Sequence, residues 1–582
     1  MEQNQLDELS PTIELSHESG WTNIGETYVR GAIFVANQLL REQEFATRIA
    51  NIQTKSSFKS FLEDSAGQYA IIHETEDGWH IAVDHIRSWP VYYTTGPELV
   101  ISDSSVVAHD SSPENNYDSL AASEYLFTSY VNGSDTLSKN VQQTEPGELI
   151  TFQDQTANTI VRENYFTYGC ETQTEDGTFD ELDELFNHVF RRLIEYADGR
   201  PIILPLTGGF DSRLIALKLA DVGYQDIVAY TSAPEEGSDD LAKAKQVAEA
   251  LGFDHVHLQI EEDDYRGFYT SGQWEEFHKS IGFLGELPKM NSQFLNRALN
   301  SHPEIPDTGV IVQGHHALGG ASKLPRLVGE QSRLSIDEFL HYIWKYSYAR
   351  WRIDPLCSKE REIEKSLQYR IISQLPGDLY QNQTTEPTSE AIRGIESYYW
   401  RNRLPKYFLV HYEQESGEYD HWYPLLDKAY FEYLDKVDWK QKVDKKIQKD
   451  YVKALHTEQL SHNSSLNDDF VSSSGATFTE GLAQSLKNQV WDRSARLFAR
   501  SPKPIEYLLK AVYYSTYGRP VDYDSKKEFR LVSERLFNQM NLRVAHRRPL
   551  QLLMLYNDGL FSVENIFIKK ALEDVDREET QG

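Results

Sequence analysis

A short segment near the middle of the chain combines glycines, hydroxyls and a carboxylate in an order that suits phosphate binding. An apolar run that begins at Pro201 stops at Thr207–Ser212 (TGGFDS), and an amphipathic stretch continues over Ser212–Leu219. This pattern predicts a buried strand, a tight loop and the first turn of a helix. Two adjacent glycines let the backbone come close to a ligand, and a helix start offers N–H groups and a positive dipole end.

The loop supplies both kinds of group that a phosphate needs. The candidate phosphate contacts are the backbone amides of Gly208, Gly209 and Phe210 and the hydroxyls of Thr207 and Ser212. Asp211 is the candidate ligand for a divalent cation beside the phosphates. The alternative is an ordinary glycine-rich turn at the end of an α/β strand.

The common nucleotide-binding loops are excluded, because no Gly-Lys-Ser/Thr follows the glycines and the segment contains no GxGxxG. The segment instead resembles the SGGxDS pyrophosphate loop of ATP pyrophosphatases, in the asparagine synthetase-like branch. Thr207 replaces the usual first serine and keeps the hydroxyl. The resemblance implies that the loop grips the phosphates of ATP, with Mg²⁺, while a carboxylate attacks the α-phosphate and AMP and pyrophosphate are released.

The elements around the loop alternate between apolar strands and amphipathic helices. We expect a helix over Phe179–Tyr196, further strands over Asp226–Ser232 and His255–Ile260, and between them a helix that ends at Gly252. This order predicts a parallel sheet with right-handed crossovers, whose ligands bind beyond the carboxyl ends of the strands. In the family, the end of the second strand holds adenine and ribose, which implies contacts at Tyr230, Thr231 and Ser232.

One departure from the family lies in Val310–Gly320, which resembles its next strand and glycine-rich end. Gly314 matches and is a candidate nucleotide contact, but His315 and His316 stand where the family has an acid that helps bind magnesium. This departure leaves three alternatives. Either one of the two histidines takes over part of the role of the acid, or Asp211 and the phosphates hold the ion alone, or ATP binding is weakened or lost. Because adjacent strand residues point to opposite faces, a histidine bonded to phosphate or backbone is favoured over a metal site.

The acidic pair Asp239 and Asp240 follows Ser238 at the start of the next helix and resembles the family's "D...A..vA..lG" element. The favoured interpretation is that the pair caps and charges the helix N-terminus, with metal binding as the alternative.

The last third of the chain is expected to be mostly helical. Its segment from His421 to Asp427 (HWYPLLD) resembles the family's "evRvPfLD", with His421 where many members have arginine. Such ligases use a lysine here to stabilise the negative transition state. Lys449, in a helix that resembles "K..lR.a", is the candidate catalytic residue, Lys503 is a second candidate, and an ordinary exposed lysine is the alternative. We expect the polar stretch Ser461–Thr477 to close over the site.

The first third turns to short strands after Gly67, with turn residues between them and a helix pair before them. These strands resemble, in order, elements of the glutaminase domain of asparagine synthetases; the best match is Val83–Tyr93. That resemblance implies an Ntn-hydrolase-type αββα domain. Such domains use a cysteine exposed as the first residue, whereas Glu2 follows Met1 here and the first cysteine is Cys170.

We therefore expect this region not to hydrolyse glutamine and to act as scaffold or interface, unless the true start differs and carries the cysteine. The same loss is seen in β-lactam synthetases and lasso-peptide cyclases. The expected domains are 1–172, glutaminase-like, and 173–582, an ATP pyrophosphatase domain with a helical C-terminal half, joined by a linker over Tyr168–Thr178. The fold class is thus α+β followed by α/β.

Composition narrows the function classes. The formal net charge is −32, which argues against a nucleic-acid-binding surface. Cys170 and Cys357 are too few for a disulfide framework or a zinc ribbon, and no apolar run approaches the length of a membrane span. With no secretion signal at the start, these features predict a cytoplasmic protein with no membrane partner.

Three functions are consistent with the sequence. The first is an amide-forming ligase that adenylates a small-molecule or peptide carboxylate and transfers it to an amine or ammonia, as a possible homodimer. The second is an ammonia-dependent asparagine synthetase. The third is a non-catalytic homologue that acts as a binding or scaffold protein.

Overall fold

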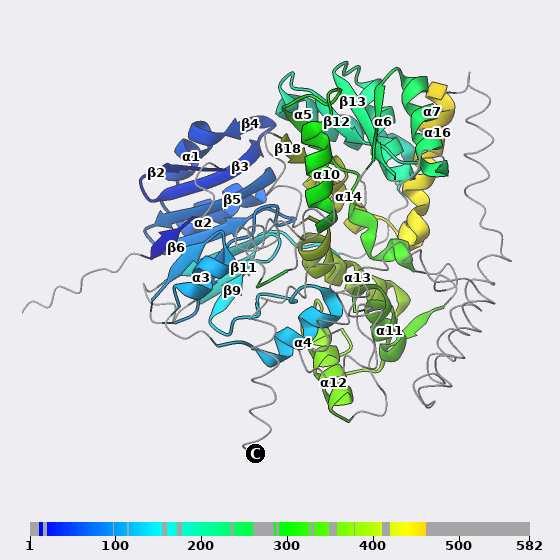
Figure 1. Ribbon diagram of the computed structural model, residues 1–582. Coiled ribbons are helices and arrows are strands. Elements are labelled where there is room, and N and C mark those ends of the chain that lie inside the picture. The colour runs from blue at the N-terminus through cyan, green and yellow to red at the C-terminus, as the bar shows by residue number, and fades with distance from the viewer. Residues whose placement is uncertain are drawn as a thin grey trace, which may run out of the picture.

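The computed structural model describes residues 11–460, apart from 16–19, 97, 113–115, 154–159, 171–176, 234–237, 260–283, 287–289, 325–327, 329–330, 349–357, 378 and 410–418. Lys503, Cys357, the stretch Ser461–Thr477 and most of the expected linker lie outside the described residues. In Figure 1 the N-terminal region, in blue, lies beside the green and yellow remainder of the chain.

Two β-sheets form the N-terminal region. The larger is antiparallel, and its strands are β2 (Trp21–Ile24), β3 (Thr27–Val35), β4 (Gln38–Arg41), β5 (Ser65–Thr75), β6 (Gly78–Val83), β10 (Glu148–Phe152) and β11 (Ile160–Asn164). The smaller has the order β1 (Thr12–Glu14), β8 (Val100–Ser102), β7 (Tyr92–Thr94) and β9 (Val141–Gln143). The predicted strands begin only after Gly67, so β2, β3 and β4, which precede it, were not predicted from the sequence.

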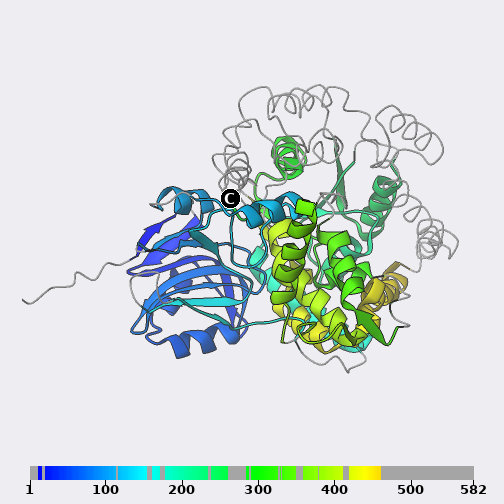
Figure 2. The ribbon, with the colours of Figure 1, turned by 90° about the horizontal axis from the view of Figure 1, so that it is seen from below.

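The side chains of β5 alternate between two apolar cores. Ile72 packs with residues of the smaller sheet such as Ile101, whereas Ile71 packs with residues of α1 (Glu42–Ala50) and α2 (Lys55–Glu63). The short helix α3 (Ser105–Asp110) packs on the smaller sheet. Two facing sheets between outer helices therefore build this region, as the two views show (Figures 1 and 2). Its assignment as Ntn-hydrolase-type stays a prediction.

A third sheet, of five strands, is wholly parallel, as the sequence predicts. Its order is β14 (Asp254–Leu258), β13 (Ile227–Ser232), β12 (Ile202–Pro205), β15 (Gly309–Val312) and β18 (Tyr419–Trp422). The central strand β12 buries Leu204 in the core shared with α5 (Phe179–Ala197) and α6 (Phe210–Asp221), and Ile203 in the core shared with α10 (Met290–Ser301). Both faces of the sheet are thus covered.

The remaining described elements are mostly helical, as expected of the last third. They include α4 (Ser119–Thr128), α7 (Asp239–Leu251), α11 (Ile336–Ser347), α12 (Ser358–Ser373), α13 (Thr388–Tyr398), α14 (Lys428–Lys436), α15 (Trp439–Lys442) and α16 (Lys446–Leu460). Two further elements complete this part of the chain: β18 adds a strand to the parallel sheet, and a π-helix, η5, spans Tyr399–Leu409.

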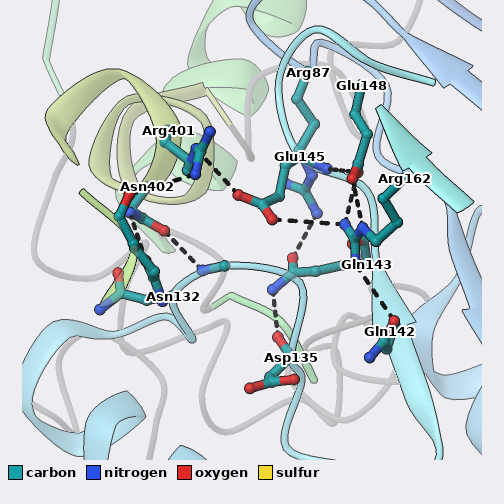
Figure 3. A network of polar contacts seen from close by, with 12 residues as sticks. Arg87, Asn132, Asp135, Gln142, Gln143, Glu145, Glu148, Arg162, Arg401 and Asn402 are labelled. Atoms are coloured by element: carbon teal, nitrogen blue, oxygen red, sulfur yellow. Dashed lines mark hydrogen bonds and ion pairs between the residues drawn. The ribbon is translucent and has the colours of Figure 1, made fainter. Parts of the chain in front are cut away.

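A network of charged side chains joins the two regions. Arg162 makes a bidentate pair with Glu148, at 2.5 and 2.7 Å, inside the N-terminal region. Glu145 lies between Arg162, at 3.6 Å, and Arg401 of η5, at 3.4 Å. Figure 3 shows these side chains, with Arg401 reaching Glu145 from the helix. Because Glu148 is almost fully buried, the pair fixes the geometry of this contact.

Lys406 makes a second link between the regions from the same π-helix. Its ammonium is buried and donates to the backbone carbonyls of Val131, at 2.9 Å, and Gly133. On the neighbouring turn, Asn402 Oδ1 accepts a hydrogen bond from the Gly133 N–H at 2.8 Å. Burial lowers the pKa of Lys406 to about 7. A loop of the N-terminal region thus satisfies a buried amine of the larger region.

Candidate functional site

The loop that follows β12 is tightly folded around its own hydroxyls. The Thr207 N–H donates to Ser212 Oγ at 3.0 Å, and the two hydroxyl oxygens lie 2.9 Å apart. The Gly209 N–H donates to Thr207 Oγ1 at 3.2 Å, and Gly209 is the N-cap of α6 without a side-chain cap of its own. The expected order of strand, loop and helix start is therefore present, with the loop at the carboxyl end of the central strand.

Gly208 shows why this position is glycine. Its N–H donates to Asp240 Oδ1 on α7 at 2.7 Å. A Cβ on Gly208 would lie 2.7 Å from that same oxygen and 3.2 Å from Cδ of Lys243. A side chain here would displace the Asp240 carboxylate and crowd Lys243, so glycine is the residue that permits this contact.

Asp211 in the first turn of α6 is held by side chains from a distant part of the chain. Its carboxylate accepts from Lys445 Nζ at 2.6 Å and from Gln448 Nε2 at 2.7 Å, and His316 Nε2 lies 3.7 Å away. Burial of the carboxyl would raise its pKa, but the neighbouring His316 and Lys445 and the hydrogen bonds outweigh burial, and the pKa is lowered. Asp211 is an ionised carboxylate at the mouth of the loop.

Basic side chains gather on the loop in an otherwise acidic protein. Arg213 Nη2 donates to the Gly208 carbonyl at 3.2 Å, and burial lowers the pKa of Arg213 to about 10. Lys449 Nζ lies 5.8 Å from the centre of the Phe210 ring and pairs with Asp444 at 2.7 Å. With Lys243 and Lys445, four cations surround a short loop in a chain whose net charge is −32. Lys445 and Lys449 are each paired with a carboxylate, so the loop combines cations with acidic partners.

A comparison with family models identifies this part of the chain. Residues 181–270 match the asparagine synthase family. The match runs from α5 through β14 and so contains the whole glycine loop, Asp211 and Asp240. No curated protein sequence matches the chain.

Among solved structures, two similar chains are synthetases by their titles. An NMN synthetase from Francisella tularensis is 16% identical with a TM-score of 0.20, over 39% of this chain and 94% of that one. An NH3-dependent NAD synthetase from Campylobacter jejuni subsp. jejuni, in complex with nitrate, is 13% identical with a TM-score of 0.17, over 37% of this chain and 92% of that one. These low TM-scores support no argument about function.

Lys445 is the lysine nearest to Asp211 of the glycine loop. No pattern in the sequence marked it as a candidate. The candidate Lys449 lies four residues later and is paired with Asp444. Asp444 and Lys445 both have positive φ, 56° and 55°, which is uncommon for residues other than glycine. This strained turn before α16 directs Lys445 to Asp211, and such strain is typical of functional sites.

The other candidate residues lie near the carboxyl ends of the same parallel strands. Gly314 lies against the start of α6, because a Cβ on it would be 3.5 Å from the Ser212 nitrogen. Thr231 is buried, and its hydroxyl bonds to the Leu206 carbonyl at 2.7 Å and to His255 at 2.9 Å. Tyr230 belongs to an apolar core, and Ser232 is exposed at the end of β13. Only Ser232 of these three presents its side chain to solvent, so contacts of Tyr230 and Thr231 with a nucleotide stay predictions.

The two adjacent histidines diverge, in keeping with the expectation that they do not form a metal site together. His316 faces Asp211, whereas the His315 ring packs against Phe408 and Tyr423 at 5.8 and 6.0 Å. At the start of α7, Ser238 is the N-cap and both acids lie in the first turn. Asp239 and Asp240 therefore charge the helix start, and Asp240 also bonds to the loop.

Two carboxylates reach this loop, those of Asp211 and Asp240. Among the residues that the structure describes, no three histidine, cysteine or acidic side chains converge to hold a metal. Mg²⁺ in nucleotide sites is held by one or two carboxylates together with the phosphates of the substrate. Asp211 fits that role as the metal's protein ligand. In the same described part of the chain, no helix has the length and apolarity to cross a membrane.

Proposed function

We propose that this protein is an ATP-dependent ligase that adenylates a substrate carboxylate and joins it to an amine or to ammonia. The observation that carries the proposal is the glycine loop at the carboxyl end of β12, closed by Asp211 and surrounded by four basic side chains. The asparagine synthase match over residues 181–270 supports the same class of reaction.

The loop groups have distinct tasks in this reaction. The amides of Gly208, Gly209 and Phe210 and the hydroxyls of Thr207 and Ser212 would hold the β- and γ-phosphates. A carboxylate oxygen of the substrate attacks the α-phosphorus, the bond to the bridging oxygen breaks, and pyrophosphate leaves. The nitrogen nucleophile then attacks the acyl carbon, loses a proton, and AMP leaves. Bound Mg²⁺, held by Asp211, would neutralise phosphate charge.

Lys445 is the residue that we assign to charge stabilisation at the α-phosphate. Its ammonium lies 2.6 Å from Asp211 and is only partly exposed, so it is both near the loop and shielded from bulk water. A cation fixed before reaction stabilises charge that develops as the leaving group departs. Lys449, which is engaged by Asp444, is assigned a secondary role in the local field.

The nitrogen would come from an amine or from ammonia rather than from glutamine. The sequence contains no cysteine among residues 1–169, and the first one, Cys170, is exposed at the end of the N-terminal region. We therefore propose that the N-terminal region contributes structure and not glutamine hydrolysis.

The test is pyrophosphate release from MgATP, measured with a panel of carboxylates in the presence of ammonia and simple amines. We expect release that depends on one acceptor class and that falls about a thousandfold in Asp211→Asn. Asp239→Asn removes an exposed carboxylate at the start of α7 and serves as the matched control. Its rate should stay near that of the wild type.

The outcomes separate the functions. Aspartate as the single competent acceptor would identify an ammonia-dependent asparagine synthetase. No release with any acceptor, together with no calorimetric binding of MgATP or pyrophosphate, would contradict the enzyme and leave a scaffold protein.

A further inference from the structure

Asp240 makes a contact that its own helix does not need. The first turn of α7 is capped by Ser238, whose hydroxyl accepts from the Leu241 N–H. Asp240 instead reaches across to the glycine loop, and its Oδ1 accepts from the Gly208 N–H at 2.7 Å. Its carboxylate therefore occupies one of the backbone donors that phosphate binding would use.

A carboxylate and a phosphate cannot both take this donor. The peptide N–H carries one hydrogen and makes one strong hydrogen bond, so a phosphate oxygen must displace Asp240 Oδ1. Asp240 is exposed to solvent, and its side chain can be hydrated after it leaves the loop. The neighbouring Gly209 N–H is likewise taken internally, by Thr207 Oγ1. In this conformation the loop satisfies its own donors with groups of the protein.

We propose that Asp240 is an autoinhibitory occupant of the pyrophosphate loop. It holds the Gly208 amide when no nucleotide is present, is displaced by the phosphates of ATP, and returns as pyrophosphate leaves. The contact lowers affinity for the phosphates, and for the product pyrophosphate in particular, which speeds its release. This inference rests on the proposed function, because it concerns the same loop.

The experiment measures binding of inorganic pyrophosphate to the full-length protein by calorimetry, without divalent metal. Asp240→Ala should lower the dissociation constant about three- to tenfold relative to the wild type, since the competing acceptor is gone. Removal of any nearby negative charge also favours an anion. Asp239→Ala removes the same charge one residue away, and it measures this general effect. Asp240→Asn, which keeps a neutral acceptor, should lie between wild type and Asp240→Ala.

A second readout does not depend on ligand binding. In the ligand-free protein, amide hydrogen exchange of a peptide that spans 206–213 should be faster in Asp240→Ala than in Asp239→Ala, because the Gly208 N–H has lost its acceptor.

The outcomes distinguish failure of the autoinhibitory role from failure of the proposed function. If the wild type binds pyrophosphate and Asp240→Ala binds it no more tightly than Asp239→Ala, or more weakly than wild type, the autoinhibitory role is wrong while the proposed function stands. If the wild type binds neither pyrophosphate nor MgATP, the proposed function is wrong and the inference falls with it.

Discussion

The protein has two clusters of charged side chains, one at the contact between the regions and one at the glycine loop. Both consist of ion pairs between basic and acidic side chains, but the two clusters differ in exposure. In the first cluster, Glu148 is 4% exposed and forms a bidentate pair with Arg162 inside the N-terminal region, and Glu145 links Arg162 to Arg401 of the larger region (Figure 3). At the loop, Asp211 is 25% exposed, and Lys445 holds it through one short contact. The first cluster lies inside the packed contact, and the second opens at the carboxyl edge of the parallel sheet.

This difference in exposure indicates which charged side chains can exchange a protein partner for a ligand. A buried pair leaves an uncompensated charge when one partner is lost, so it is suited to a fixed structural role. A partly exposed pair at a sheet edge can exchange a protein partner for a ligand at smaller cost, because water compensates the group that is released. We therefore expect mutations in the first cluster to change stability and mutations in the second to change binding and catalysis.

The largest expected effect is at the loop. Lys445→Ala should lower the rate of acceptor-dependent pyrophosphate release about 100- to 1000-fold, since it removes the cation nearest Asp211. Steady-state kinetics with MgATP should show the loss mainly in kcat. Lys449→Ala is the matched control, one helical turn away and paired with Asp444, and should lose less than about tenfold. A larger loss for Lys449→Ala than for Lys445→Ala would restore Lys449 as the catalytic lysine.

The next effect concerns the contact between the regions. Arg162→Met should lower the free energy of unfolding by about 3 kcal/mol, because it leaves the buried Glu148 without its bidentate partner. Urea denaturation measures the change, and pyrophosphate affinity of the folded variant should be unaltered. A variant with normal stability, or with weakened pyrophosphate binding, would contradict the division between structural and exchangeable charges.

The pH dependence of stability should also differ between buried groups and the partly exposed Asp211. His85 is buried against Phe166 and Phe431, and its Nε2 bonds to the Leu426 carbonyl at 2.7 Å. Burial lowers its pKa to about 4, and burial lowers that of His80 to about 4 as well. Because the unfolded state takes up these protons near pH 6.5, the free energy of unfolding should fall as pH drops from 6.5 to 4.

His85→Gln keeps a donor for Leu426 but cannot titrate, so it should remove up to about 3 kcal/mol of this decline. Urea denaturation at several pH values between 4 and 7 measures it. The pKa of Asp211 is lowered, so the stability that this carboxylate contributes persists through the same window and is lost only at lower pH. An unchanged pH slope in His85→Gln would rule out His85 as the cause.

The glycine loop could be predicted from sequence because its signal is local. Glycines, hydroxyls and one acid stand within six residues after an apolar strand, and those residues alone specify the turn and helix start. Lys445 carried no such signal. Its contact with Asp211 spans 234 residues and depends on a backbone turn at Asp444 and Lys445 that residue types do not announce.

The fold shows the same division. The strands β12, β13 and β15 are apolar runs buried on both faces, and each was predicted. Strand β18 reads Tyr-Asp-His-Trp, and its place at the sheet edge comes from pairing with β15 rather than from its own pattern. The hairpin of β3 and β4 turns at Ala36 and Asn37, both with positive φ, and no glycine marks it.

The position of Lys406 bears on how the larger region depends on the N-terminal region. Its buried amine in the larger region finds acceptors only on a loop of the other, among the contacts described. A chain that discarded residues 131–133 would leave that buried amine without these two acceptors, at the cost of an unsatisfied polar group. Folding of the larger region is therefore by itself a reason to retain the N-terminal region, whatever chemistry that region has.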